Sequence, residues 1–171
     1  GGQYTIPAAA GAQTVTGQAF KPDVVLMMTV QRTNNAGSNG GDSCLTIGAM
    51  CIDGTQAVVS GNSNNGAANA QSMSYCNDIE CMVLWDGTVT ATAGRGTFTS
   101  MNSDGFTFNW DEMSSSGTII ANWVMIKGGL WTIKSLLTQT DTTTDTTISG
   151  CNFEPVGGLF LTFTVAMLIA L

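Results

Sequence analysis

The residue types that most often carry catalysis are sparse in this chain. Its 171 residues include no histidine, which excludes Ser-His-Asp and Cys-His catalysis and most catalytic zinc sites, because imidazole is the usual base and zinc ligand there. No Walker loop occurs, and no glycine-rich dinucleotide fingerprint leads from a strand into a helix. We therefore expect a protein that is not an enzyme and that uses no cofactor.

The cysteines are the next candidates for chemistry, and they are five in number: Cys44, Cys51, Cys76, Cys81 and Cys151. A zinc site built from four cysteines usually contains C-x-x-C pairs, and none is present. Disulfide bonds between the near pairs, Cys76–Cys81 or Cys44–Cys51, are an alternative. Because an unpaired cysteine behaves as a small hydrophobic residue, we expect free thiols buried on strands.

Three pairs of acidic residues are candidates for a Ca²⁺ site or for the two carboxylates of a glycosidase: Asp78 with Glu80, Asp111 with Glu112, and Asp141 with Asp145. Calcium needs about six to eight oxygen ligands, and no EF-hand-like series of aspartates surrounds these pairs. A glycosidase needs a cleft that holds both carboxylates, and no pattern indicates one. We interpret these residues as solvated loop acids and predict no metal site.

Three tryptophans are candidates for a sugar-stacking platform: Trp85, Trp110 and Trp123. Each lies in an apolar or alternating stretch, which favours packing in the core. If one of them is exposed instead, it would combine with the Asn-rich stretches 33–43 and 60–72 to bind a host surface glycan.

Charge is scarce along the whole chain. Only 10% of residues are charged, against about 25% in a typical domain, while 43% are hydrophobic and the net charge is −7. The basic residues are scattered singly, so neither nucleic acid nor an anionic membrane surface is an expected partner. The most apolar stretch, residues 159–171, is shorter than the roughly 20 residues that span a bilayer. It predicts a buried strand, with a truncated membrane anchor as the alternative.

The hydrophobic pattern predicts strand after strand. In residues 106–110, Phe106, Phe108 and Trp110 share one face, and residues 24–30 form an apolar run typical of a strand buried on both faces. Further strands are expected at 44–51, 79–85, 97–101 and 118–127. Asp-Gly pairs at 53–54, 86–87 and 104–105 suit tight hairpin turns. The clearest of these, at 86–87, would join 82–85 to 88–92.

The beginning of the chain returns, altered, near its end. Tyr-Thr-Ile at 4–6 matches Trp-Thr-Ile at 131–133, and Phe-Lys-Pro at 20–22 matches Phe-Glu-Pro at 153–155. The offsets of 127 and 133 residues define a unit that is too long for a solenoid repeat. Gly128-Gly129 closes the first unit, so the chain holds one whole unit and the first strands of another.

These motifs resemble a β-sandwich module that occurs, often in tandem, in structural proteins of tailed bacteriophages. The matching residues are Phe20, Pro22 and Asp23, then the stretch 104–110, and then Trp123 through Gly128-Gly129. The resemblance covers residues 4–129, and 130–165 matches the start of a second copy, where Val156 stands in the place of Asp23. It implies a virion component, either a head decoration or cement protein or a tail or fibre subunit. Such proteins assemble in the reducing cytoplasm of the host bacterium, which favours free thiols.

We predict an all-β antiparallel sandwich, jelly-roll-like, over residues 1–129, with a β-rich extension at 130–171 that is a partial second copy. The expected function is non-enzymatic assembly in many symmetric copies on a phage particle, as a homo-oligomer (by preference a trimer) that contacts other virion proteins. Half a module exposes unpaired edges and apolar faces. The extension is therefore expected to pack against a neighbouring subunit or a continuation of the chain, through Leu159, Phe160, Leu161, Phe163, Val165, Met167, Leu168, Ile169 and Leu171.

Two alternatives remain open at this point. One is an adhesion module of a phage tail that binds host glycans through the Asn-rich stretches. The other is a structural β protein of a bacterial surface or secreted by bacteria, for which disulfide bonds would be expected.

Overall fold

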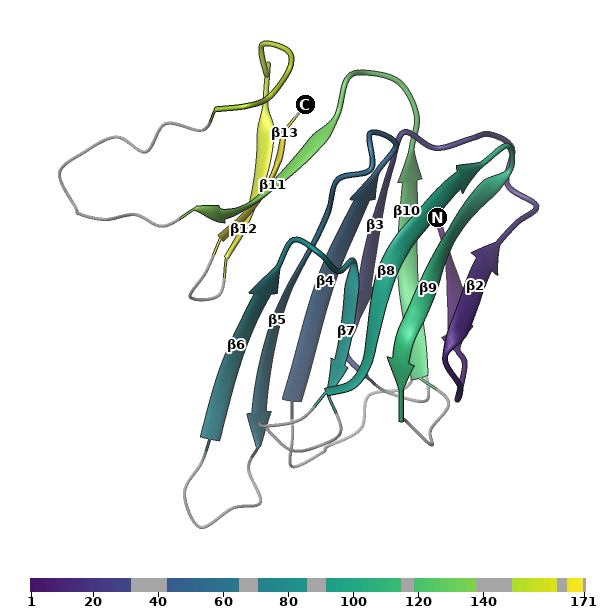
Figure 1. Cartoon of the computed structure of the whole chain (residues 1–171), viewed down its shortest axis with the longest axis vertical. Coiled ribbons are helices and arrows are strands. Elements are labelled where there is room, and N and C mark those ends of the chain that lie inside the picture. Colours follow the sequence, from purple (N-terminus) through teal and green to yellow (C-terminus); the bar gives the residue numbers. More distant parts are fainter. Residues whose placement is uncertain are drawn as a thin grey trace, which may run out of the picture.

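A β-sandwich with a small third sheet forms the protein (Figure 1). The computed structural model describes residues 1–31, 43–64, 71–85, 92–114, 119–137, 149–162 and 166–170. Every regular element in these ranges is a strand. Accordingly, no helix in the described part of the chain is long and apolar enough to cross a membrane. The predicted all-β antiparallel sandwich is confirmed.

Three antiparallel sheets, here named A, B and C, contain all the strands. Sheet A has the order β1-β10-β3-β4-β5-β6, with β1 Gly2–Ile6, β10 Ile119–Ile126, β3 Val24–Thr29, β4 Ser43–Cys51, β5 Gln56–Asn64 and β6 Gln71–Asn77. Sheet B has the order β2-β9-β8-β7, with β2 Gly11–Val15, β9 Gly105–Met113, β8 Thr92–Asn102 and β7 Met82–Trp85. Sheet C has the order β11-β13-β12, with β11 Thr132–Leu137, β13 Ala166–Ala170 and β12 Gly158–Thr162.

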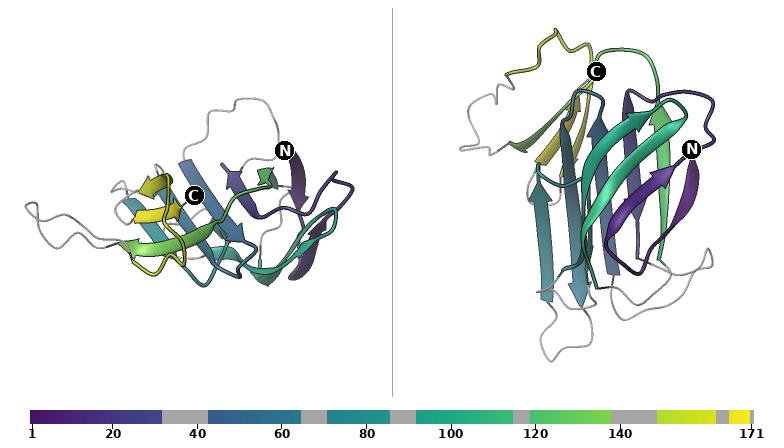
Figure 2. Two further views of the ribbon diagram at one scale, coloured as in Figure 1. Left: turned by 90° about the horizontal axis from the view of Figure 1, so that it is seen from above. Right: turned by 45° about the vertical axis from the view of Figure 1, so that its right-hand side comes forward.

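The main core lies between sheets A and B, and alternation along the strands builds it. On β9 the predicted inward residues Phe106, Phe108 and Trp110 are all fully buried. On β10, Trp123 and its alternate neighbours point into the same core. Since side chains alternate across a strand, the intervening residues of both strands face away from it. Figure 2 shows the two layers from two further directions.

Several predicted elements differ from the structure in their boundaries, such as the strand predicted at 97–101, which is β8 from Thr92 to Asn102. The Asn-rich stretch 60–72, whose composition is typical of a loop, is strand at both ends, because β5 continues to Asn64 and β6 begins at Gln71. Those Ser/Asn-rich residues form strands because the neighbouring backbones satisfy their hydrogen bonds regardless of side chain. β7 begins at Met82 rather than at 79, since the preceding residues cross from sheet A to sheet B.

The Asp-Gly pairs act as turns in different ways. Gly54, at φ +90°, donates its amide to the Cys51 carbonyl at 3.0 Å in the β4–β5 hairpin. Gly105 pairs with Asn102 at the β8–β9 turn. The pair at 86–87 and the stretch 33–42 lie outside the described residues. Trp85 is paired with Thr92, however, so the predicted two-residue turn there is wrong in register.

The closest approach between the sheets is at Gly48 on β4. A β-carbon at this position would overlap the carbonyl oxygen of Cys81, where the chain enters β7. Backbone atoms cannot move aside without disturbing both sheets.

We therefore expect Gly48→Ala to lower the free energy of unfolding by about 1–3 kcal/mol, the usual cost of overpacking, in a urea titration. Gly94→Ala is the matched control, because its added methyl would meet the flexible end of Met113 at 3.1 Å. Equal effects of the two substitutions would contradict this account of Gly48.

Candidate functional site

The outer face of sheet A, which points away from the main core, is the most distinctive surface of the molecule. On β3, Val25 and Met27 belong to the main core, so Leu26 and Met28 point outward. On β10 the outward residues include Val124. Strand β3 is thus apolar on both faces, which explains the unbroken run at 24–30.

Strand pairing aligns these outward residues into rows. Val124 stands opposite Leu26, Leu26 opposite Ala49, and Ala49 opposite Ala57. The next row contains Asn122, Met28, Ile47, Val59 and Cys76. The outer face is therefore one apolar strip that runs from β10 across β3 and β4 to β5 and β6.

Half of this strip is covered and half is open. On β4 and β5, the outward side chains form a second buried cluster with Ile133 of β11: Ala49, Cys51, Ala57 and Val59. On the other half, Met28 is 45% exposed, Val30 is 52% exposed and Val124 is 51% exposed. The prediction that 24–30 is buried on both faces is therefore wrong for Met28 and Val30, because β11, which covers the other half, contacts mainly β4, β5 and β6 among the described strands.

Hydrogen bonds hold β11, the strand that covers half of the outer face, in place. The Ile133 amide donates to the Thr55 hydroxyl at 3.0 Å, and the Cys51 thiol donates to the Trp131 carbonyl at 3.1 Å. Asp53 accepts from the Thr55 amide at 2.9 Å and from the Thr55 hydroxyl at 2.5 Å. The β4–β5 turn therefore both builds the hairpin and holds β11.

Two titratable groups reflect this docking. Burial raises the pKa of the Cys51 thiol to about 11, so the thiol stays protonated and can donate at neutral pH. Burial alone would raise the pKa of Asp53, but hydrogen bonds from Thr55 outweigh it and hold that pKa below its ordinary value. Asp53 is therefore ionised when it accepts those bonds.

A turn at two glycines, between β10 and β11, redirects the chain toward the outer face of sheet A. Gly128 and Gly129 have φ of +96° and +83°, a conformation that side chains disfavour. The Gly128 amide donates to the Asp23 carboxylate at 2.6 Å, and the Trp131 indole donates to the Gly128 carbonyl at 2.5 Å. Asp23, singled out in the sequence, thus fixes the turn between β10 and β11.

The two copies of the repeat use equivalent residues on different partners. Ile6 and Tyr4 point into the main core, where Tyr4 contacts Phe108 edge to face at 5.8 Å. Their counterparts Ile133 and Trp131 pack on the outer cluster of sheet A. Residues 131–133 therefore turn toward the outer face of sheet A the side that, in the matching residues 4–6, faces the main core.

The strand order supports this equivalence. In sheet A, β10 lies between β1 and β3, and in sheet C, β13 lies between β11 and β12, which are the repeat counterparts of β1 and β3. All these pairings are antiparallel. Figure 1 shows sheet C beside the β4–β6 side of the sandwich and away from β2.

A shallow apolar pocket opens where the two copies meet. It has a volume of about 250 Å³ and is lined by Gly129, Leu130, Trp131, Phe153, Glu154 and Val156. Leu130 is 67% exposed and Val156 is 95% exposed. The pocket has a single carboxylate, Glu154, and no second reactive group among its lining residues, so it offers apolar contact rather than chemistry.

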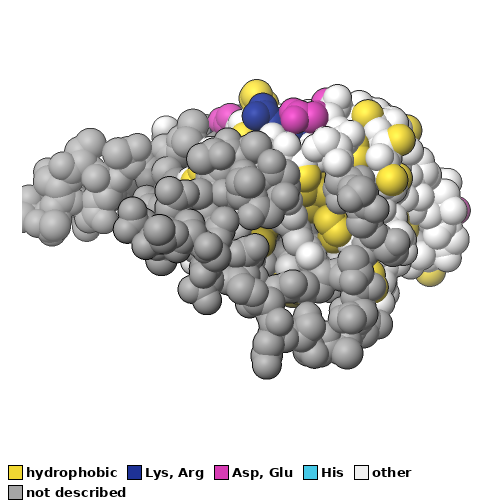
Figure 3. All heavy atoms as spheres, turned by 90° about the horizontal axis from the view of Figure 1, so that it is seen from below, with side chains coloured by type: hydrophobic (Ala, Val, Ile, Leu, Met, Phe, Trp, Pro, Cys, Tyr) yellow, Lys and Arg dark blue, Asp and Glu magenta, His cyan; other side chains and the backbone are white. Residues whose placement is uncertain are grey.

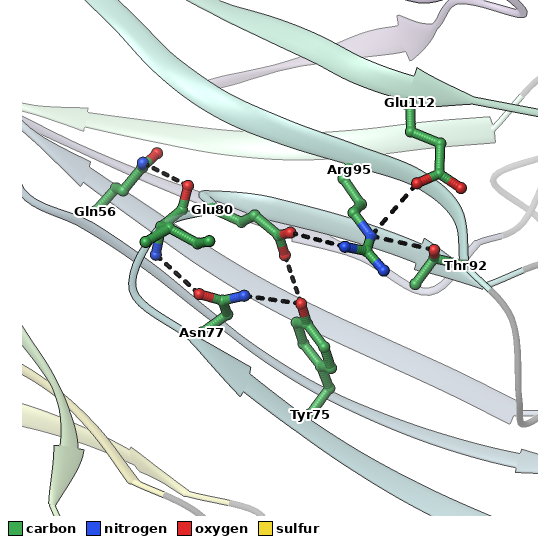
Figure 4. A network of polar contacts seen from close by, with 8 residues as sticks. Gln56, Tyr75, Asn77, Glu80, Thr92, Arg95 and Glu112 are labelled. Atoms are coloured by element: carbon green, nitrogen blue, oxygen red, sulfur yellow. Dashed lines mark hydrogen bonds and ion pairs between the residues drawn. The ribbon is translucent and has the colours of Figure 1, made fainter.

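A polar cluster joins the two sheets of the sandwich at one side (Figure 4). Buried Glu80, on the segment that crosses from β6 to β7, accepts from the Tyr75 hydroxyl at 2.8 Å and lies 3.7 Å from the Arg95 guanidinium. Arg95 also lies 3.5 Å from Glu112, whose side chain is half exposed. Gln56 donates to the Ile79 carbonyl at 2.8 Å and accepts from the Phe98 amide at 2.7 Å.

The end of β3 is held by a second polar contact. Gln31 has φ of +52°, which is uncommon outside glycine. Its side-chain amide donates to the Trp85 carbonyl at 2.7 Å and accepts from the Trp85 amide at 2.9 Å and from the Cys44 thiol at 2.7 Å. Burial raises the pKa of Cys44, so this thiol is a structural donor and not an activated nucleophile.

The cysteines are free thiols in the structure, and the positions of the two proposed disulfide pairs explain why. Cys44 points toward Gln31, whereas Cys51 belongs to the outer cluster. Cys76 likewise faces the outer cluster and Cys81 the main core. Each pair is split between the two faces of sheet A, and side chains that point apart cannot be bridged.

The tryptophans and acids take structural positions. The three candidate tryptophans are all buried: Trp85, Trp110 and Trp123. Their predicted packing in the core is confirmed, and none of them presents a ring to a sugar. Glu80 is held within the polar cluster, Asp111 accepts from the Asn109 side-chain amide at 2.7 Å, and Glu112 lies 3.5 Å from Arg95. Asp141 and Asp145 lie outside the described residues, within which no three His, Cys, Asp or Glu side chains gather to hold a metal.

The predicted assembly residues lie mainly on sheet C. Leu159 is 44% exposed. Phe160 and Leu161 lie on β12, and Met167, Leu168 and Ile169 lie on β13, which runs near β5 of the first unit. Phe163, Val165 and Leu171 lie outside the described residues. Packing of this segment against a neighbouring subunit stays a prediction.

Several residues that hold the structure around the outer face and the end of β3 were not singled out by their chemistry in the sequence. Thr55 and Asp53 had only the Asp-Gly turn as a signal, and Gln31 had none. The repeat did mark Trp131 and Ile133, but not the face on which they dock.

Comparisons with known proteins give no match for the chain: no protein-family model, no curated protein and no solved structure matches it. Nothing in these comparisons links it to phage structural modules, so that link is a resemblance of sequence motifs.

Docking of β11 can be tested at Ile133. Ile133→Ala removes packing that is worth about 2–5 kcal/mol in a core. We expect the rate of Cys51 alkylation, followed by peptide mapping, to rise by about tenfold or more, because the thiol is covered only while β11 is docked. Cys81, inside the main core, should keep its low rate. Ile79→Ala, at a position 66% exposed, is the control, and an unchanged Cys51 rate in the Ile133 variant would refute the docking.

The polar cluster gives a second test. We expect Glu80→Ala to cost about 1–3 kcal/mol of unfolding free energy, because the Tyr75 hydroxyl and Arg95 lose their buried partner. Glu112→Ala should cost less than about 1 kcal/mol, since that ion pair is exposed to solvent. Urea unfolding of both variants checks the difference. A larger loss of unfolding free energy for Glu112→Ala than for Glu80→Ala would show that Glu80 is not the central acid of the polar cluster.

Proposed function

We propose that the chain is a non-enzymatic virion structural protein of a tailed bacteriophage, a head decoration or cement protein or a tail or fibre subunit, that assembles in many symmetric copies. The observation that carries the proposal is the docking of the partial second copy on the outer face of sheet A. A sandwich whose outer face accepts the core side of another copy is suited to being built into a larger assembly.

The surface supports the same proposal. On the outer face, Met28 of β3 and Val124 of β10 stay about half exposed beside the covered half, and exposed apolar side chains of this kind are suited to contact with another subunit. Figure 3 shows a face of the molecule on which the described charged side chains are few and lie mostly along its upper edge, with hydrophobic side chains among uncharged ones. Contacts between many identical copies are favoured when few like charges are brought together.

The particle itself gives the test. Peptide mass spectrometry of purified phage particles encoded by the same genome should detect this chain in stoichiometric amount, as expected for a repeated subunit. An abundant host cytoplasmic protein, measured in the same preparation, controls for carry-over. Finding the chain in the soluble fraction, and in particles only at the level of that control, would contradict the proposal.

A further inference from the structure

We infer that the open half of the outer face of sheet A binds a second copy of this chain, face to face, through β3 and β10. The inference rests on the proposed assembly function for its biological meaning and names the partner and the residues. Its central residues are Met28 and Val124, both about half exposed, with exposed Asn122 opposite Met28.

The first argument is continuity with an interface that already exists in the chain. The row that begins at Val124 and Leu26 continues into Ala49 and Ala57. These two alanines are fully buried in the cluster that β11 of sheet C covers. The strip is thus one surface, and its β4–β5 half shows that it buries well against apolar side chains of this same sequence. The open half has the same apolar character and lacks a cover within the described residues.

The second argument concerns charge. The chain carries a net charge of −7, so two copies repel over most approaches. The outward positions of β3 and β10 are Val24, Leu26, Met28, Ile120, Asn122, Val124 and Ile126, and none is charged. Contact between two copies through this face therefore buries no like charges.

The geometry also defines the symmetry. When the same patch meets itself, the contact is isologous and generates a two-fold axis. The second copy then lies over β3 and β10, next to sheet C of the first copy, which lies over β4 and β5. The unit of assembly would be a dimer, and higher symmetry would arise from other surfaces.

The experiment is sedimentation velocity on the full chain across a range of concentrations. The wild-type chain should form a dimer, and Met28→Glu should raise the dimer Kd by about a hundredfold or more, because like charges would face each other in a desolvated contact. Thr99→Glu, at an exposed position of β8 on the other sheet, is the matched control and should leave the Kd unchanged.

A second pair of variants keeps the test decisive if Met28→Glu fails to fold. Asn122→Lys and Asn122→Glu change an exposed side chain in the row of Met28, and each should weaken the dimer, whereas an equimolar mixture of the two should restore association. A wild-type chain that stays monomeric, or a dimer that neither Asn122 variant weakens, overturns the inference. Either result can occur in a chain that is present in particles, so failure here is distinct from failure of the proposed function.

Discussion

The aromatic packing of β9 against sheet A is the contact on which the rest of the structure depends. Phe108 meets Tyr4 at 5.8 Å, and Phe106 meets Trp123 at 5.7 Å, both edge to face. The indole nitrogens of Trp110 and Trp123 have no hydrogen-bond acceptor in the described structure. Edge-to-face geometry offsets part of that cost, because it places positive ring edges against negative ring faces. With its inner side committed to this core, sheet A has only its outer side left for further contacts.

A second constraint follows from the composition of β3 and β4. These central strands are apolar on both sides, which is typical of strands that lie between two layers. A two-layer sandwich covers only one of those sides, so the outer side must gain cover elsewhere. The chain supplies part of that cover from its own partial repeat, through Ile133 and the Thr55 and Asp53 hydrogen bonds. The layered arrangement is thus a consequence of strand composition and not an accident of where the repeat lies.

Much of the sandwich could be predicted from the sequence, and the reasons are local. The alternation at Phe106, Phe108 and Trp110 and the turn at Gly54 depend on neighbouring residues alone. The separation of Cys44 and Cys51 to opposite faces was also available, because an odd spacing along one strand has that result. The conformation of Gln31 was not predictable, since its φ of +52° is imposed by the distant backbone of Trp85. Neither was the half-cover of β3, which depends on how far β11 reaches.

The repeat was the best sequence signal for assembly, and the structure sharpens what a repeat can tell. Equivalent residues keep their type and their direction from the strand, as Ile6 and Ile133 do, because strand periodicity sets both. They do not keep their partner, because the partner is whichever apolar surface lies within reach. Ile6 finds sheet B, and Ile133 finds the back of sheet A. The partial repeat therefore does not leave Ile133 of β11 exposed to water, since the outer face of sheet A buries it. The open half of sheet A, where Met28 and Val124 are about half exposed, is a second surface that could gain cover from another molecule.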